Sequence, residues 1–177
     1  VEGDLESRVI HGPERIGHYD VLIPIGSGGM ATVYLARRAV ATGVPREFAL
    51  KLMHPHLRGD PDWATHLLHE ARIAARIRHP NVVSVVEAGD DPMGLFLVLD
   101  YVEGDTLSGL SRELRAKQQR LPLAISGRIL IDALTGLHAA HELHDESGNP
   151  LGLVHRDFSP QNILVGIDGI SRLTDFG

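Results

Sequence analysis

Short apolar segments separated by turn residues fill the first hundred residues, and their lengths suit strands better than helices. Five strands are predicted, at residues 20–25, 32–36, 47–53, 82–86 and 95–99. The first two flank a cluster of glycines as a hairpin, and the last two are joined by a turn-rich stretch at 89–94. This half of the chain is therefore expected to form a sheet.

Helical spacing interrupts the strands once and then dominates the second half. Residues 61–78 carry an apolar stripe within which Glu70 lies, a short helix follows Thr106 as its cap, and a long helix runs from 122 to about 144. Two short strands follow near the end. A strand-rich half with one helix, followed by a mainly helical half, predicts a two-lobed α+β fold. The cleft between such lobes is a natural place for a nucleotide.

The change of pattern also sets the expected domain boundaries. Residues 1–18 are a polar lead-in, 19–99 the strand-rich lobe, 100–105 a hinge, and 106–177 part of the helical lobe. The chain begins with an acidic stretch that has neither an initiator Met nor a signal peptide. We expect it to be a piece of a longer protein.

Composition argues against several classes of function. The 17 basic and 23 acidic residues give a net charge of −6, which offers no field for attracting nucleic acid. Unbroken apolar runs fall far short of the roughly 20 residues that a membrane helix needs, so no membrane segment is expected. The chain has no cysteine, which excludes disulfides and thiolate metal sites and is compatible with the cytoplasm, the predicted location.

The glycine cluster Gly26, Ser27, Gly28, Gly29 lies between two predicted strands. A dinucleotide-binding turn would need a helix to follow, and no P-loop motif occurs anywhere in the chain. Glycines in a hairpin let backbone amides approach phosphates, and the flanking apolar residues could cover an adenine ring. The alternative is a hairpin whose glycines serve only the turn.

Lys51 lies within an apolar strand, where an unpaired ammonium is costly to desolvate. It therefore needs a partner, and Glu70 on the buried face of the following helix is the candidate. A lysine held in this way could contact the α- and β-phosphates of a nucleotide. The alternative is a lysine that reaches solvent and an ordinary surface glutamate.

The most specific signal is His155-Arg156-Asp157 with Asn162 five residues later, followed by Asp175-Phe176-Gly177. This spacing brings a carboxylate and an amide oxygen to one side of a tight loop, where one can accept a hydroxyl proton and the other can hold Mg²⁺. Asp175 adds the anionic ligand that a hard cation prefers. The set predicts phosphoryl transfer from ATP.

Over residues 19–177 the chain resembles a bacterial, eukaryotic-like Ser/Thr protein kinase, with these motifs in the family's order. The resemblance implies a protein-kinase-like two-lobed fold: a five-stranded N-lobe sheet with one helix, and a truncated, mainly helical C-lobe. It implies ATP and Mg²⁺ as cofactors, proteins with Ser or Thr acceptors as substrates, and a role in signal transduction.

The resemblance also implies roles by position. Asp157 is the catalytic base, Lys51 and Glu70 form the activating ion pair, and Asn162 and Asp175 hold the metal. The residues implied to bind ATP are Ile25, Gly26, Ser27, Gly28, Gly29, Val33, Ala49, Lys51, Leu99, Asp100, Val102 and Leu164. Among them, Leu99 is the gatekeeper, the backbone of Asp100 and Val102 faces adenine, and Ala49 and Leu164 enclose the ring.

Two positions depart from the family pattern. Ala31 stands where a third glycine is usual, which the backbone tolerates, and Ser159 stands where a lysine usually neutralises the transferred phosphate. Ser159 keeps open a second hypothesis, an ATP-binding pseudokinase that acts as a scaffold. A third alternative, a small-molecule phosphotransferase, fits Arg156 and the glycine loop less well.

The sequence ends at the Asp-Phe-Gly motif, before the activation segment and the peptide-binding helices of the family. We therefore expect it to be weak or inactive by itself. The apolar side of the helix at 122–144 would lack packing partners, and exposed apolar area of this kind favours self-association.

Overall fold

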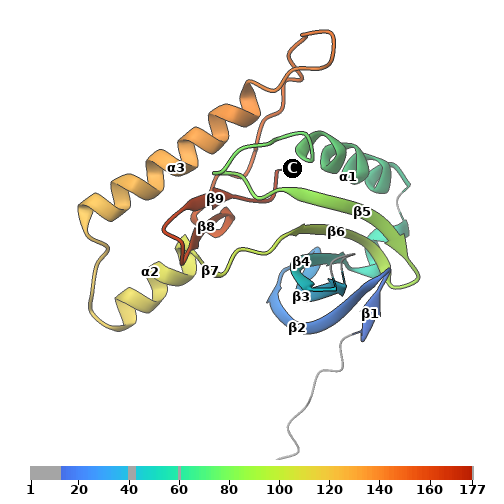
Figure 1. Cartoon of the computed structure of the whole chain (residues 1–177), viewed down its shortest axis with the longest axis horizontal. Helices are drawn as coiled ribbons and strands as arrows, with labels where there is room; N and C mark the ends of the chain where they lie inside the picture. Colours follow the sequence, from blue (N-terminus) through green and yellow to red (C-terminus); the bar gives the residue numbers. More distant parts are fainter. Residues whose placement is uncertain (1–12, 40–42, 60, 177) are drawn as a thin grey trace, which may run out of the picture.

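A computed structural model describes residues 13–39, 43–59 and 61–176, and it contains a large sheet with one long helix and a smaller part with two helices (Figure 1). The large sheet is antiparallel, with the strand order β1-β2-β3-β4-β6-β5. Its strands are β1 (Arg15–Ile16), β2 (Tyr19–Ser27), β3 (Ala31–Ala39), β4 (Pro45–Met53), β5 (Val85–Asp91) and β6 (Gly94–Asp100). The two-lobed α+β prediction is confirmed.

The large sheet has one strand more than the five expected. Arg15–Ile16 pairs with β2 as β1, and the Ile16 side chain is fully buried beside Tyr19 and Phe48. A strand of two residues has no periodicity to detect, and its neighbours are polar, so the sequence pattern did not reveal it. The expected lead-in of residues 1–18 thus contains a strand, while its residues 1–12 lie outside the described part of the chain.

The fourth predicted strand begins later than expected. Residues 82–86 were predicted as a strand, but β5 starts at Val85. Val82 instead forms a bridge to Leu173, and the Val83 N–H donates to the Leu173 carbonyl at 2.8 Å. These two valines are apolar because they pack against the second part of the molecule, so their hydrophobicity does not indicate membership of β5.

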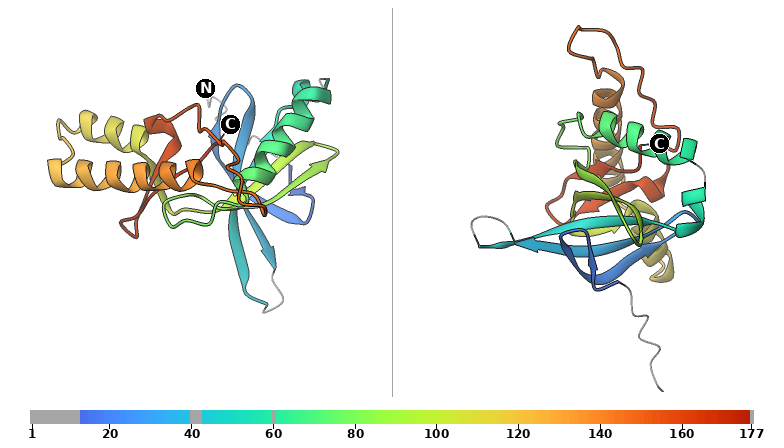
Figure 2. Two further views of the ribbon diagram at one scale, coloured as in Figure 1. Left: turned by 90° about the horizontal axis from the view of Figure 1, so that it is seen from above. Right: turned by 90° about the vertical axis from the view of Figure 1, so that its right-hand side faces the viewer.

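The helix of the first part, α1 (Pro61–Ala74), lies against β5 on one side of the large sheet (Figure 2). The short 3₁₀ helix η1 (Pro55–Gly59) precedes it. The prediction extended this helix to residue 78, but the Ile77 N–H donates to the Ala74 carbonyl, an i→i+3 bond that ends the α-helical pattern. Ala71, Ala74 and Ile77 are buried, as the predicted stripe requires.

The second part combines a three-stranded sheet with two helices. Its elements are β7 (Gly104–Thr106), α2 (Leu107–Ala116), α3 (Leu123–His141), the 3₁₀ helix η2 (Pro160–Asn162), β8 (Ile163–Gly166) and β9 (Ser171–Leu173). The Thr106 hydroxyl caps α2 by accepting the Gly109 N–H at 2.9 Å, as predicted. The long helix ends at His141, three residues before the expected end.

Helix α3 packs on β9 through a buried carboxylate. Asp132 is 2% exposed; it accepts the Ser171 N–H at 3.1 Å and pairs with Arg128 at 2.9 Å. By length and composition α3 could also cross a membrane, with a mean hydropathy of 1.2, which the search for unbroken apolar runs did not anticipate. Core helices of globular domains pass the same test, and the contact with β9 buries one side of α3.

Candidate active site

The glycine hairpin forms one wall of a cavity of about 720 Å³ between the two parts of the molecule. Every residue that the sequence placed around a nucleotide lines it: Ile25, Gly26, Ser27, Gly28, Gly29, Val33, Ala49, Lys51, Leu99, Asp100, Val102 and Leu164. They come from β2, the turn between β2 and β3, β3, β4, β6, the lobe connection (residues 100–103) and β8. The structure thus brings together residues up to 139 positions apart in the chain, from Ile25 to Leu164.

The tip of the hairpin gives a ligand access to the backbone. A Cβ atom built on Gly28 or Gly29 would meet no atom within 4 Å. The Gly28 N–H donates to the Ala31 carbonyl at 2.9 Å, which closes the turn between β2 and β3. Bare backbone of this kind lets phosphate oxygens approach closely.

Lys51 extends from β4 toward the end of the chain. In β4 it lies opposite Val33 of β3 and Leu97 of β6, so its strand is central in the sheet. Its Nζ donates to Asp175 Oδ1 at 2.5 Å, which joins the two parts of the molecule across the cavity. The partner expected from the sequence was Glu70, whose side chain lies outside the described residues.

The catalytic-looking loop is closed by its own side chains. Asn162 is buried, and its Nδ2 donates to the Asp157 carbonyl at 3.0 Å and to Asp157 Oδ2 at 2.8 Å. The Asp157 side chain is exposed on a neighbouring cavity of about 420 Å³ that Lys51 and Asp175 also line. The predicted base therefore faces the same space as the other charged residues of the site.

His155 fixes this loop against the strand that leads to Asp175. Its ring is 1% exposed, its Nε2 is 3.1 Å from the Thr174 carbonyl, and it lies 4.5 Å from the Phe176 ring. Because a carbonyl can only accept, Nε2 carries the proton in this contact. The histidine therefore packs under the loop and supports it, and its ring does not line the cavity.

Two residues of the site have left-handed backbone. Arg156 has φ 62° and Asp175 has φ 59°, in the region that L-residues other than Asn and Asp rarely adopt. The Asp157 N–H donates to the His155 carbonyl at 2.8 Å around Arg156, which makes the turn tight. Asp175, as an aspartate, adopts this conformation more readily, so the strain falls on Arg156, and strain of this kind gathers at functional sites.

The oxygen atoms available suit Mg²⁺. The Asn162 amide nitrogen is used by Asp157, which leaves its oxygen as an acceptor, and Asp175 supplies a carboxylate. Within residues 13–39, 43–59 and 61–176, no three His, Cys, Asp or Glu side chains form a metal cluster. Two protein oxygens are enough for Mg²⁺, which takes its remaining ligands from phosphates and water.

Several residues of the cavity were not found by sequence reasoning. They are Met30, Val83, Tyr101, Gly104, Asp105, Thr106, Gln161 and Thr174, with Ala31 noted only as a departure. Four of them, Tyr101, Gly104, Asp105 and Thr106, lie in or next to the predicted hinge. The hinge was therefore the signal in the sequence that could have placed them at the cavity. Val83 gave none, because its bond to Leu173 of β9 joins residues 90 positions apart and is not visible in the sequence.

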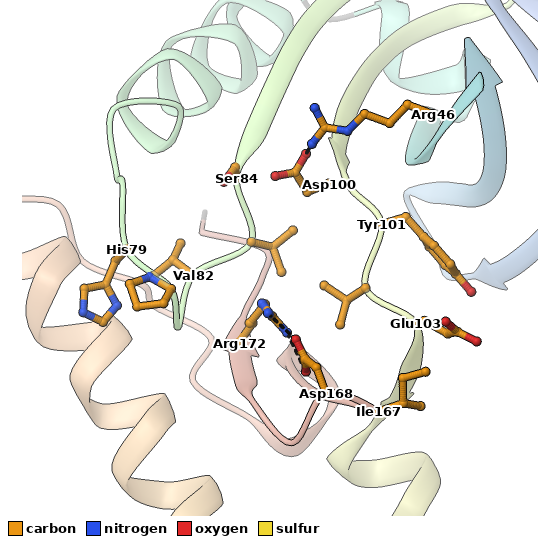
Figure 3. A pocket seen from close by; sticks show the side chains of 13 residues that line it. Arg46, His79, Val82, Ser84, Asp100, Tyr101, Glu103, Ile167, Asp168 and Arg172 are labelled. Atoms are coloured by element: carbon orange, nitrogen blue, oxygen red, sulfur yellow. Dashed lines mark hydrogen bonds and ion pairs between the residues drawn. The ribbon is translucent and has the colours of Figure 1, made fainter. Parts of the chain in front are cut away.

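The lobe connection also borders a third cavity of about 570 Å³, which shares Val83, Asp100, Tyr101 and Val102 with the cavity beside the glycine hairpin (Figure 3). Two ion pairs lie among its charged residues: Arg46 with Asp100 at 2.7 Å, and Arg172 with Asp168 at 2.7 Å. The Arg172 guanidinium holds the pKa of the Asp168 carboxyl below its usual range.

Comparison with known families decides the classification. The family model for the protein kinase domain matches residues 19–177. The chain belongs to the protein kinase domain family. A solved kinase domain, PknI of Mycobacterium tuberculosis, superposes with a TM-score of 0.73 at 27% identity, covering 91% of this chain and 59% of that one. The kinase fold predicted from the sequence is confirmed.

Curated relatives of this kinase domain carry two kinds of name. It is 38% identical over 161 residues to the tyrosine-protein kinase MasK of Myxococcus xanthus, covering 91% of this chain and 25% of that protein. It is also 38% identical over 159 residues to the serine/threonine-protein kinase PknL of Mycobacterium tuberculosis, covering 90% and 36%. The chain therefore spans between a quarter and about a third of the length of these relatives.

Proposed function

We propose that the protein containing this chain transfers the γ-phosphoryl group of ATP, bound with Mg²⁺, to Ser or Thr hydroxyls of other proteins. The observation that carries the proposal is the convergence of Lys51, Asp157 and Asp175 on one space beside the glycine-lined cavity. The bacterial serine/threonine-protein kinases among the relatives support the same acceptor class.

The proposed roles follow from the chemistry of each group. Asp157, exposed and oriented by the Asn162 amide, accepts the proton of the attacking hydroxyl. Lys51 places its ammonium against the α- and β-phosphates, and the carboxylate of Asp175 with the oxygen of Asn162 holds the metal. Mg²⁺, when bound, neutralises charge on the transferred group.

The lobe connection supplies the adenine contacts in this proposal. The Asp100 N–H already donates to the Ser84 carbonyl at 3.0 Å, so Asp100 can offer a ligand only its carbonyl oxygen. Val102 would supply the backbone N–H, and Ala49 with Leu164 would enclose the ring from the two lobes. Because the reaction draws on ATP and protein acceptors, we assign it to the cytoplasm.

The test is transfer of labelled phosphate from MgATP to the full-length gene product and to a generic protein acceptor, with Asp157→Asn alongside. We expect transfer that falls by at least a hundredfold in the variant, because the general base is removed, while ATP affinity changes little. ATP binding without transfer in the wild-type protein would favour the scaffold hypothesis. Transfer to an aminoglycoside in place of protein would favour a small-molecule phosphotransferase.

Tyrosine is a second candidate acceptor, because the relative MasK is named a tyrosine-protein kinase. Ser159 is compatible with it, since the lysine usual in Ser/Thr kinases is absent. Acid hydrolysis of the labelled acceptor separates phosphoserine, phosphothreonine and phosphotyrosine. Label confined to tyrosine would overturn the Ser/Thr assignment and leave the kinase assignment intact.

A further inference from the structure

Three polar side chains lie side by side at the base of the glycine hairpin: Ser27 at the end of β2, Thr32 near the start of β3, and His54 directly after β4. Ser27 of β2 lies opposite Thr32 of β3, and Thr32 lies opposite Leu52 of β4. Because side chains alternate along a strand, His54, two residues beyond Leu52, shares the face of Thr32. The contacts agree: Ser27 Oγ lies 3.4 Å from Thr32 Oγ1, which lies 3.2 Å from His54 Nε2.

His54 also contacts the tip of the hairpin with its other ring nitrogen and its backbone. Nδ1 lies 3.2 Å from the Gly29 carbonyl, and the His54 N–H donates to the Met30 carbonyl at 2.9 Å. The Gly29 carbonyl can only accept, so Nδ1 carries a proton in this contact, and Nε2 shares the other hydrogen bond with the Thr32 hydroxyl. One side chain therefore bridges two points of the hairpin.

The residue after His54 helps to place it. Pro55 disfavours helical backbone at the preceding residue, so η1 begins only at Pro55. His54 can then continue the direction of β4, and its N–H extends the pairing with β3 by one bond beyond Ala31 and Met53. The sequence Met53-His54-Pro55 thus sets both the backbone and the ring of His54.

The hairpin tip has little packing of its own. Gly28 and Gly29 have open space around their α-carbons, and Met30 is 64% exposed. Glycines without neighbours sample many conformations. Hydrogen bonds that order such a loop before the ligand arrives reduce the entropy that binding must offset.

We propose that His54 is a positioning residue that holds the tip of the glycine hairpin over the bound nucleotide by bridging Gly29 and Thr32. The inference rests on the proposed function for the identity of the ligand. It adds a residue outside the glycine loop, at the end of the neighbouring strand, to the determinants of nucleotide affinity.

The first experiment measures amide hydrogen exchange in the nucleotide-free, full-length gene product, which requires no catalysis. We expect His54→Ala to accelerate exchange of the amides at 28–32 on the order of tenfold, while amides within β4 stay unchanged. His56→Ala is the matched control. His56 is exposed, and its ring lies 5.8 Å from that of His54, outside the hairpin contacts. Unchanged exchange at 28–32 in His54→Ala overturns the inference.

Two further variants test separately the contact of His54 with the Gly29 carbonyl and its contact with the Thr32 hydroxyl. Asn can place an amide donor near Nδ1 of the original ring and so retains the contact with Gly29; Thr32→Val removes the hydroxyl that faces Nε2. We expect His54→Asn and Thr32→Val each to accelerate exchange less than His54→Ala. If His54→Ala also accelerates exchange throughout β4, Thr32→Val decides, and no change at the tip in that variant overturns the bridge.

The second experiment measures the Kd of a non-hydrolysable ATP analogue with Mg²⁺. We expect His54→Ala to weaken binding about threefold to tenfold and His56→Ala to leave it within twofold. If His54→Ala accelerates amide exchange at 28–32 but leaves the Kd of the ATP analogue unchanged, His54 does not contribute to nucleotide binding and the inference is overturned. Absence of phosphoryl transfer in the wild-type protein would instead overturn the proposed function, while the exchange result would still decide whether His54 orders the hairpin.

Discussion

Ser159 stands where the Ser/Thr kinases that the chain resembles usually carry a lysine. Its backbone is extended, with φ −138° and ψ 159°, and its carbonyl accepts the Asn162 N–H at 3.0 Å. A longer side chain at this position leaves both the backbone conformation and this hydrogen bond in place. We predict that Ser159→Lys raises kcat toward a Ser or Thr acceptor on the order of tenfold, because a cation there stabilises the transferred phosphate. Steady-state rates measure this, with Ser159→Met as the uncharged control. An equal increase in both variants would refute the charge explanation.

Tyr19 makes stability depend on pH at the alkaline end. Burial, together with the hydrogen bond to Glu87, raises the pKa of Tyr19 to about 12. A group whose pKa is raised on folding stabilises the fold fully below its unfolded pKa, near 10, and this contribution is lost as the pH rises toward 12. We predict that the free energy of unfolding falls more steeply between about pH 10 and 12 in the wild-type protein than in Tyr19→Phe. Denaturant titrations at each pH measure it, and parallel curves would contradict the assignment.

At the scale of residues, sequence reasoning found groups of the site whose observed partners lie far away along the chain. Lys51 was expected to need an anion because it lies in an apolar strand, and the structure gives it Asp175, more than a hundred positions away. His54 was not singled out at all. Its contacts depend on which residues lie opposite each other in three strands, and that register is not visible in a single apolar pattern.

At the scale of elements, two glycines of α3 provide a matched pair of tests. A Cβ atom on Gly136 would lie 2.3 Å from the Asn81 carbonyl, whereas one on Gly127 would meet nothing within 4 Å. We predict that Gly136→Ala destabilises the protein by about 2 to 3 kcal/mol through this clash. Gly127→Ala should stabilise it by about 0.5 to 1 kcal/mol through helix propensity. Chemical denaturation of both variants measures the two changes in the free energy of unfolding, which are expected to have opposite signs. Equal changes would show that the close approach of α3 to residue 81 does not affect stability.

Element boundaries were predicted where a local signal exists. Thr106 caps α2 as expected, because a capping hydroxyl is a local feature of the sequence. The strand β1 and the start of β5 were not predicted, because both are set by distant partners: β2 for Arg15–Ile16, and Leu173 for Val82 and Val83. Apolar residues that pack against the other part of the molecule, as Val82 and Val83 do, cannot be distinguished in the sequence from apolar residues that continue a strand.

At the scale of the whole molecule, α3 presents an apolar face that the described residues leave uncovered. Leu123, Leu130, Ile131 and Leu134 recur at helical spacing and are between 49% and 88% exposed. We predict that the 177-residue chain by itself forms concentration-dependent oligomers, because burial of this face is favourable. Sedimentation velocity of the chain and of a variant with Ile131→Glu and Leu134→Glu measures it.

The expected result is that the double variant is monomeric at every concentration. Ile167→Glu is the control, because Ile167 is 73% exposed but lies between β8 and β9, away from α3. A wild-type chain that sediments as a monomer throughout would contradict the prediction. So would a control variant that dissociates the oligomers as well as the double variant does.

The chain passes between the two parts of the molecule in two places, at 81–84 and at 100–103. The Asp100 N–H bond to the Ser84 carbonyl ties these crossings together, and the Asn81 and Val83 backbones are fastened to Leu173. Because two connections held side by side resist twisting, we expect the two parts to move relative to each other as a hinge about these crossings. A single interlobe distance, measured spectroscopically, would then follow this motion.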